Sequence, residues 1–230
     1  MRDIGLNKRL LCAADLVREG AVLADVGTDH GYLPIYLILR GKIKRARLSD
    51  INEGPLESAR ANAASSGVSQ YVELSLADGA ASLSDKGATD YSILGMGGEL
   101  IARIIADAPH LKDHRINLIL QPMSRPEALR RELFDSGYSI IKEVYCADAG
   151  KYYVVILASF TGEKTDYSAV DLTFGKEDVF FSASSDEMKA YMSVRKSRLE
   201  KIIKGKLSAD ESIDEEKLLL DRLCERMSGL

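Results

Sequence analysis

Two acids and two glycines alternate directly after a short apolar run near the start of the chain. The run Val22–Val26 leads through Asp25 to Gly27, Asp29 and Gly31. Glycine adopts positive φ and lets a ligand approach the main chain closely. The segment therefore predicts a strand, a tight turn and a helix. In open α/β sheets, a turn at the carboxyl end of a parallel strand is where nucleotides bind.

The acid inside this turn selects among nucleotides. Asp29 stands where the dinucleotide fingerprint G-x-G-x-x-G has its second glycine. A carboxylate there would repel a pyrophosphate, so the turn favours a nucleoside with a positive group. S-adenosylmethionine fits, because it has a sulfonium and an ammonium but no phosphate. A purely structural turn is the alternative, since a lone glycine turn is a weak signal.

Later strand ends carry further candidate contacts. Asp50 ends a short strand and could accept hydrogen bonds from ribose hydroxyls. The Asp78-Gly79 pair could accept from the adenine amino group, and Gly95–Gly98 lies where the methyl group would emerge. Each could instead be a cap or an ordinary turn, but their recurrence at successive strand ends favours S-adenosylmethionine. The candidate cofactor contacts are Asp25, Gly27, Asp29, His30, Gly31, Asp50, Ile51, Asp78, Gly79, Gly95, Met96 and Gly97.

Strands and helices that alternate about every 20 residues must position these side chains. The pattern predicts an α/β fold with a mostly parallel, seven-stranded sheet that is covered on both faces and closed by an antiparallel hairpin. This plan resembles the Rossmann-like class I methyltransferase fold. The expected strands are Val22–Val26, Arg45–Asp50, Val72–Leu76, Tyr91–Leu94, Asn117–Gln121 (ended by Pro122), Ser139–Cys146 and Tyr152–Phe160.

The character of the sequence changes after Phe160. Residues 1–161 are expected to form the methyltransferase domain, and residues 162–230 a C-terminal helical domain. Positions 161–185 have no clear period and predict a linker. Two helices, 186–206 and 213–227, are expected to form an antiparallel hairpin that resembles a coiled coil.

Composition excludes several classes of protein. No apolar run reaches the ~18–20 residues of a membrane helix, and Met1–Gly5 lacks the apolar core of a signal peptide. Three scattered cysteines suit a reducing cytosol, so we expect a cytoplasmic protein. His110 and His114 have no evident third ligand, and no metal site is expected.

Three motifs make a resemblance specific. Gly27–Pro34 (GTDHGYLP), Leu94–Gly98 (LGMGG) and Ile119–Pro122 (ILQP), together with Asn7–Leu10 (NKRL), resemble the TrmK family. The resemblance implies a bacterial tRNA methyltransferase that modifies N1 of adenine 22 in the D-loop. Methyl transfer to another RNA or a small molecule, a nicotinamide-dependent oxidoreductase on the same fold, and a non-catalytic binding module are the alternatives.

The implied chemistry is direct attack of adenine N1 on the methyl group. The product base is cationic, so a nearby carboxylate would stabilise the developing charge. Asp29 is expected near the reacting groups, with His30 beside the cofactor. Tyr32 could stack on the target base, and Gln121 could shape the base pocket. His30 and Tyr32 could instead be packing residues. The catalytic candidates are therefore Asp29, Tyr32 and Gln121.

The net charge of −4 means that contacts to tRNA must come from local basic clusters. A solvated charged face is the alternative for each cluster. Charge reversal at Lys196, Arg198 and Lys201 is predicted to weaken tRNA binding. We expect a monomer or a weak dimer. One cluster is Arg40, Lys42, Lys44, Arg45 and Arg47, which Lys8 and Arg9 could join; the other is Lys189, Arg195, Lys196, Arg198, Lys201, Lys204 and Lys206.

Overall fold

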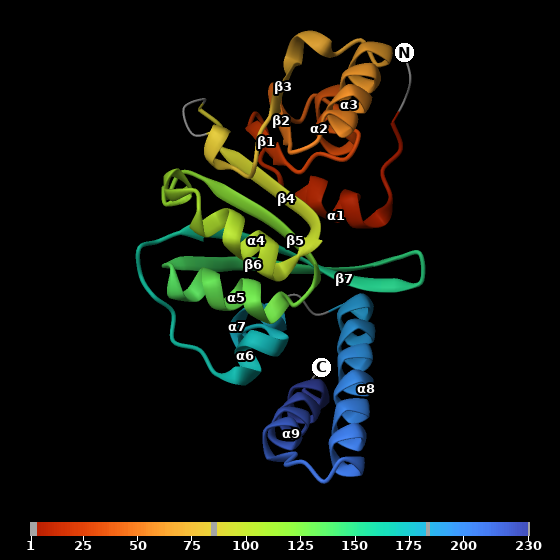
Figure 1. Ribbon diagram of the computed structural model, residues 1–230, viewed down its shortest axis with the longest axis vertical. Coiled ribbons are helices and arrows are strands. Elements are labelled where there is room, and N and C mark those ends of the chain that lie inside the picture. The colour runs from red at the N-terminus through yellow and green to blue at the C-terminus, as the bar shows by residue number, and fades with distance from the viewer. Residues whose placement is uncertain (1–3, 84–86, 183–184, 230) are drawn as a thin grey trace.

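A computed structural model of the protein describes residues 4–83, 87–182 and 185–229. Positions 1–3, and positions 183–184 of the expected linker, lie outside the described residues. Seven strands form one sheet in the order β3-β2-β1-β4-β5-β7-β6 (Figure 1). The pairs among β1 to β5 are parallel, and β7 runs antiparallel to both β5 and β6. The predicted sheet and its closing hairpin are confirmed.

The strands are β1 (Val22–Val26), β2 (Arg45–Asp50), β3 (Val72–Leu76), β4 (Asp90–Gly97), β5 (Asn117–Ser124), β6 (Tyr138–Asp148) and β7 (Lys151–Phe160). The helices are α1 (Lys8–Leu16), α2 (Tyr32–Leu39), α3 (Glu53–Ser65), α4 (Gly98–Ala106), α5 (Pro126–Asp135), α6 (Ala169–Phe174), α7 (Glu177–Ser182), α8 (Asp186–Ser208) and α9 (Asp214–Ser228). Within these described ranges, no helix is long and apolar enough to cross a bilayer.

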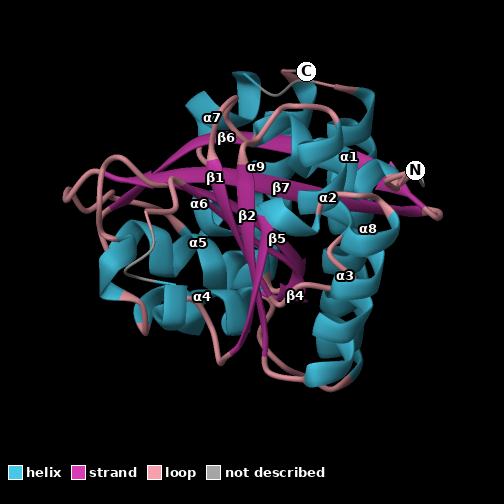
Figure 2. Cartoon of the chain, turned by 90° about the horizontal axis from the view of Figure 1, so that it is seen from above, coloured by secondary structure: helices cyan, strands magenta, loops and turns pink. Residues whose placement is uncertain are grey.

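The core lies on both faces of the sheet, as a parallel sheet requires. Successive residues of β1 point to opposite faces, so Leu23 joins one apolar cluster and Ala24 the other. The Leu23 cluster includes residues of α1 to α3, and the Ala24 cluster includes residues of α4, α5 and the C-terminal helices. Figure 2 shows helices on both sides of the twisted sheet.

Pro122 does not end β5, contrary to the prediction. The strand continues to Ser124, and Pro122 pairs with Met96 of β4 after a register shift. Pairing with β7 stops at Leu120. On that side of β5, the missing N–H of Pro122 therefore interrupts no ladder, which is where a strand tolerates proline.

The expected linker after Phe160 instead contains two short helices, α6 and α7. Ser168 and Asp171 form a capping box at the start of α6, and Leu172 and Phe174 are buried. Each helix has six residues, too few for a helical period to be visible in the sequence.

The predicted hairpin of α8 and α9 is confirmed. Leu199 and Leu223 are buried between these helices, and Met188 and Met192 share the core cluster of the sheet. The start of α8 packs on β6 and β7, while its other end extends away from the sheet beside α9 (Figure 1).

Candidate cofactor and substrate site

A cavity of about 700 Å³ opens at the carboxyl ends of β1 to β4, a volume that suits a nucleoside-sized ligand. The N-terminal part of α1 forms another wall. His30, Gly31, Gly97 and Gln121 do not line the cavity. Ten sequence candidates do: Asp25, Gly27, Asp29, Tyr32, Asp50, Ile51, Asp78, Gly79, Gly95 and Met96.

The turn after β1 owes its shape to its backbone conformation and to hydrogen bonds with β2. Gly27 has φ +71°, a conformation in which a side chain is strained. The N–H groups of Gly27 and Thr28 both donate to the carbonyl of Ser49, at 2.8 and 3.0 Å. These bonds tie the turn to β2 and bring Asp25 and Asp50 to the same cavity.

His30 and Gly31 shape the turn from behind the cavity. His30 has φ +61°, and its carbonyl accepts a hydrogen bond from Asn62 Nδ2 at 3.0 Å. Its ring stacks on Tyr32 with 5.4 Å between centroids, and its Nε2 lies 3.0 Å from Asp29 Oδ1. His30 therefore orients Asp29 and Tyr32, both of which line the cavity.

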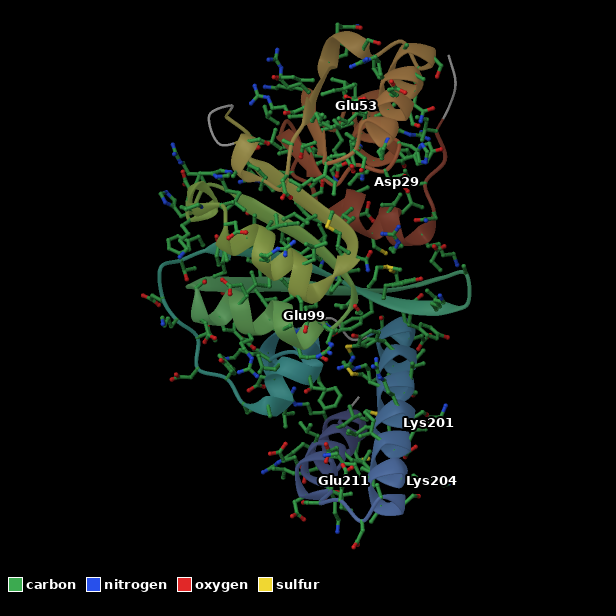
Figure 3. The ribbon with its side chains drawn as sticks, viewed as in Figure 1. Asp29, Glu53, Glu99, Lys201, Lys204 and Glu211 are labelled. Atoms are coloured by element: carbon green, nitrogen blue, oxygen red, sulfur yellow. The ribbon has the colours of Figure 1, made fainter. Side chains whose placement is uncertain are left out.

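Asp29 and Asp25 are carboxylates of opposite character. The Asp29 side chain is 87% exposed and lies beside α1 (Figure 3). Asp25 is buried and accepts hydrogen bonds from the hydroxyls of Thr28 and Ser92, both at 2.6 Å. Burial raises the pKa of Asp25, the two hydroxyls partly offset that effect, and the charge of Asp50 adds to it. Asp25 is thus a fixed acceptor, whereas Asp29 is exposed, oriented by His30, and able to meet a ligand.

Exposed apolar side chains complete the cavity. Tyr32, Ile51, Leu100 and Met123 are all exposed and all line it. Exposed large apolar groups that gather around a hollow mark a binding site. Apolar side chains of this kind can pack against the two faces of a purine ring. The predictions from the residues missed both Leu100 and Met123. Leu100 looks like ordinary core in its helix, and Met123 lies beyond the predicted end of the strand at Pro122.

Gln121 is buried and does not line the cavity, so its predicted role in shaping the base pocket stays a prediction. Its Oε1 accepts from Arg9 Nη1 at 2.6 Å and from the Gly95 N–H at 3.2 Å. Arg9, rather than Gln121, reaches the cavity. Arg9 belongs to the Asn7–Leu10 motif, but nothing local in that motif indicates a partner in β5.

The glycines at the end of β4 have different roles. A Cβ at Gly98 would lie 2.1 Å from the carbonyl oxygen of Arg125, so only glycine lets α4 begin against the loop before α5. Gly97 is the N-cap of α4, and a Cβ there would lie 3.4 Å from Ser124 Oγ. Leu94, Gly95 and Met96 are the members of the Leu94–Gly98 motif that line the cavity.

Comparisons with known proteins agree with this site. A family model described as a methyltransferase domain matches residues 6–156. The tRNA (adenine(22)-N(1))-methyltransferase of Bacillus subtilis (strain 168) is 34% identical over 175 residues, covering 76% of this chain and 74% of that protein. The chain belongs to the TrmK family of methyltransferases. The predicted family is confirmed.

Solved structures extend the likeness over nearly the whole TrmK chain. Streptococcus pneumoniae Sp1610 in complex with S-adenosyl-L-methionine is 32% identical, with a TM-score of 0.78 over 96% of this chain and 97% of that one. The B. subtilis M1A22 tRNA methyltransferase TrmK is 29% identical, with a TM-score of 0.78 over 98% and 97% of the two chains. The C-terminal helices are therefore part of the shared architecture.

The first basic cluster of this TrmK protein is largely committed to its own fold. Lys42 Nζ donates to the carbonyls of Ala14 and Asp15, and Arg47 pairs with Glu73 at 3.1 Å. The cluster precedes or begins β2, at the edge of the sheet opposite the cavity. This placement does not favour the predicted contact with RNA near the site.

The second cluster, on α8, contains some side chains that form ion pairs and others that are exposed to solvent. Arg195 pairs with Glu127 at 3.2 Å, Lys196 with Glu200 at 3.9 Å and Lys206 with Glu216 at 2.7 Å. Across the described ranges, Arg198, Lys201 and Lys204 form no ion pair and are exposed. Figure 3 shows Lys201 and Lys204 toward the end of α8 that is farther from Asp29.

The histidine pair is separated in the structure. His110 lies in a 3₁₀ turn, Pro109–Leu111, that ends before His114. Among the described residues, no three His, Cys, Asp or Glu side chains are grouped as metal ligands.

Proposed function

We propose that this protein methylates N1 of adenine 22 in the D-loop of tRNA, with S-adenosylmethionine as the methyl donor. The observation that carries the proposal is the cavity, whose acidic and apolar lining matches a cationic nucleoside within a TrmK-family fold. The relatives supply the specific nucleotide, since the B. subtilis protein is named for adenine 22.

The cavity fits this cofactor better than a dinucleotide. Asp25, Asp29, Asp50 and Asp78 all line it, and four carboxylates would repel a pyrophosphate. They can instead accept hydrogen bonds from an ammonium, ribose hydroxyls and an adenine amino group. The Asn52 N–H donates to Asp50 Oδ1 at 2.8 Å and orients that carboxylate. We assign Asp50 to the ribose and Asp78 to the adenine. When bound, S-adenosylmethionine supplies an electrophilic methyl group on its sulfur.

The chain's own residues then position the nucleophile. The N1 atom lies on the Watson–Crick edge, so the target adenine must be unstacked before it can enter the site. Tyr32, held by His30, offers a face on which an unstacked base can stack. The exposed carboxylate of Asp29 stabilises the positive charge that develops on the base. Asp29 and Tyr32 are thus the proposed catalytic residues, and Gln121 contributes by holding Arg9 and the Gly95 N–H in place.

Incubation of unmodified tRNA with the cofactor tests the reaction. Reverse transcription should stop at position 22, because N1 methylation blocks Watson–Crick pairing, and a tRNA with guanine 22 should give no stop. A stop at another position, or none, overturns the assignment. A thermal shift with NAD but not with S-adenosylmethionine would favour the oxidoreductase alternative.

The same reasoning extends to compartment and assembly. tRNA is a cytoplasmic substrate, so we assign the protein to the cytoplasm.

The α8 and α9 apolar stripes cover each other through Leu199 and Leu223, which supports a monomer or a weak dimer. Light scattering across protein concentration would overturn this if it gave a constant dimer mass.

A further inference from the structure

The amide of Gln121 has no capacity left for a substrate. Its oxygen accepts two hydrogen bonds, from Arg9 and from the Gly95 N–H. Its Nε2 donates to the Pro122 carbonyl at 2.9 Å and to Met123 Sδ at 3.5 Å, which uses both amide hydrogens. The side chain is fully buried. Gln121 therefore acts as a bracket that joins α1 to the ends of β4 and β5.

Arg9, in contrast, keeps most of its capacity. A guanidinium has five N–H donors, and the structure engages one of its nitrogens, Nη1, with Gln121. Among the described residues, Arg9 forms no ion pair with a carboxylate, although it lines a cavity with four of them. Arg9 lies beside Gly95 near the end of β4. It is therefore on the side of the cavity away from Asp50, the last residue of β2, and Asp78, which follows β3.

The chemistry of the reaction limits what Arg9 can bind. A guanidinium that donated to adenine N1 would occupy the lone pair that must attack, and it would oppose the positive charge of the product. Its planar fork matches a carboxylate or a phosphate, through two parallel N–H···O bonds. The carboxylate of S-adenosylmethionine is one such group, and a backbone phosphate is the group of this kind that the RNA itself supplies. A nucleotide drawn out of an RNA strand presents such a phosphate on each side of its ribose.

We propose that Arg9 binds a backbone phosphate adjacent to the target adenosine and so fixes the drawn-out nucleotide at the mouth of the cavity. This inference rests on the proposed function, since it requires an RNA substrate. It assigns two roles to one side chain. Nη1 anchors the guanidinium to the bracket of Gln121, and the remaining donors face the strand.

The first test leaves the protein unchanged. Synthetic tRNAs carry a neutral methylphosphonate in place of the phosphate on the 5′ or the 3′ side of the target adenosine. Wild-type kcat/KM should fall by on the order of tenfold for one of the two, because a charged hydrogen bond is lost. In the Arg9→Gln variant, the same replacement should change kcat/KM by less than about twofold. A double-mutant cycle between two interacting partners requires this, because the variant has already lost the interaction.

A second test separates charge from position. Arg9→Gln should lower the salt dependence of tRNA binding by about one unit of slope. A loss of cofactor affinity with an unchanged salt slope would assign the guanidinium to the carboxylate of the cofactor and would overturn the inference. Arg9→Lys should keep the slope but lose part of the affinity, because lysine lacks the fork. The control is Lys112→Gln, an exposed cation just after the Pro109–Leu111 turn, before β5 and so at the opposite edge of the sheet, which should leave the slope unchanged.

The outcomes distinguish this inference from the proposed function. If the wild type does not modify tRNA, the proposed function fails. If it does, but both methylphosphonates are tolerated, or Arg9→Gln lowers kcat with the tRNA affinity and salt slope unchanged, Arg9 is only part of the bracket and the inference is overturned.

Discussion

The methyl group of Met96, at the end of β4, lies directly over Gly27 in the turn after β1. A Cβ at Gly27 would come within 1.9 Å of Met96 Cε. Two strand ends that meet in the sheet thus place a flexible side chain over a bare backbone, and both residues line the cavity. The space over Gly27 is available to a ligand because Met96 can move and glycine has no side chain.

Gly27→Ala should weaken S-adenosylmethionine binding by tenfold or more, since the added methyl group occupies the cavity. The positive φ should also cost about 1–2 kcal/mol of stability. Gly41→Ala is the matched control, because Gly41 has φ +68° with no atom within 4 Å of the new Cβ. Calorimetric titration should show normal cofactor affinity in the control, despite a similar loss of stability.

Gly98→Ala should destabilise the fold by about 1–3 kcal/mol, because its Cβ would meet the backbone of Arg125, which cannot move freely. Gly97→Ala, one residue earlier, should cost less than about 1 kcal/mol as an N-cap change. Urea unfolding of both variants measures the difference. Equal midpoints would contradict the close approach of the two backbone segments.

Asp25→Asn should stabilise the ligand-free protein at neutral pH and weaken cofactor binding. Burial raises the pKa of Asp25, so the folded state binds this proton more tightly than the unfolded chain. Wild-type stability therefore falls as pH rises from the unfolded value of 3.8 through the raised folded value. Unfolding free energies measured across pH should diverge over that window in favour of the variant and then run parallel. A variant less stable than wild type at pH 7 would refute this.

Arg130→Met should destabilise the protein by about 3–5 kcal/mol, because it leaves a buried carboxylate unpaired. Arg130 and Glu143 are fully buried and joined at 2.7 Å, and Arg130 Nη1 donates to the carbonyl of Leu172 at 2.9 Å. Hydrogen exchange should therefore accelerate in α6. Arg195→Gln breaks the more exposed pair with Glu127 and should cost under about 1 kcal/mol.

Charge reversal of Arg198, Lys201 and Lys204 should weaken tRNA binding and lower its salt dependence, with cofactor affinity unchanged. Lys196→Glu should have a smaller effect, because Lys196 already faces Glu200. This refines the sequence prediction, which included Lys196. Unaltered tRNA affinity in the triple variant would exclude α8 as a contact.

The sequence by itself determined the sheet and the acidic edge. The bounds of β1, β2 and β3 agree with the predicted strands. The mostly apolar run of β1 and the alternation of polar and apolar residues in β2 and β3 are local signals that the sequence carries by itself. The acids and glycines at those ends meet because parallel strands separated by helices all end at one edge. No distance between them was needed to predict that they share a cavity.

Only the tertiary structure decided which distant groups satisfy one another. Arg9 and Gln121 are 112 positions apart, so no local period shows that Gln121 is saturated and Arg9 is exposed to the cavity. The glycine at position 98 and the buried Arg130 are explained in the same way by segments that approach from elsewhere in the chain. Sequence periodicity fixes which face of an element is apolar, whereas the partner of a buried polar group depends on how the elements pack.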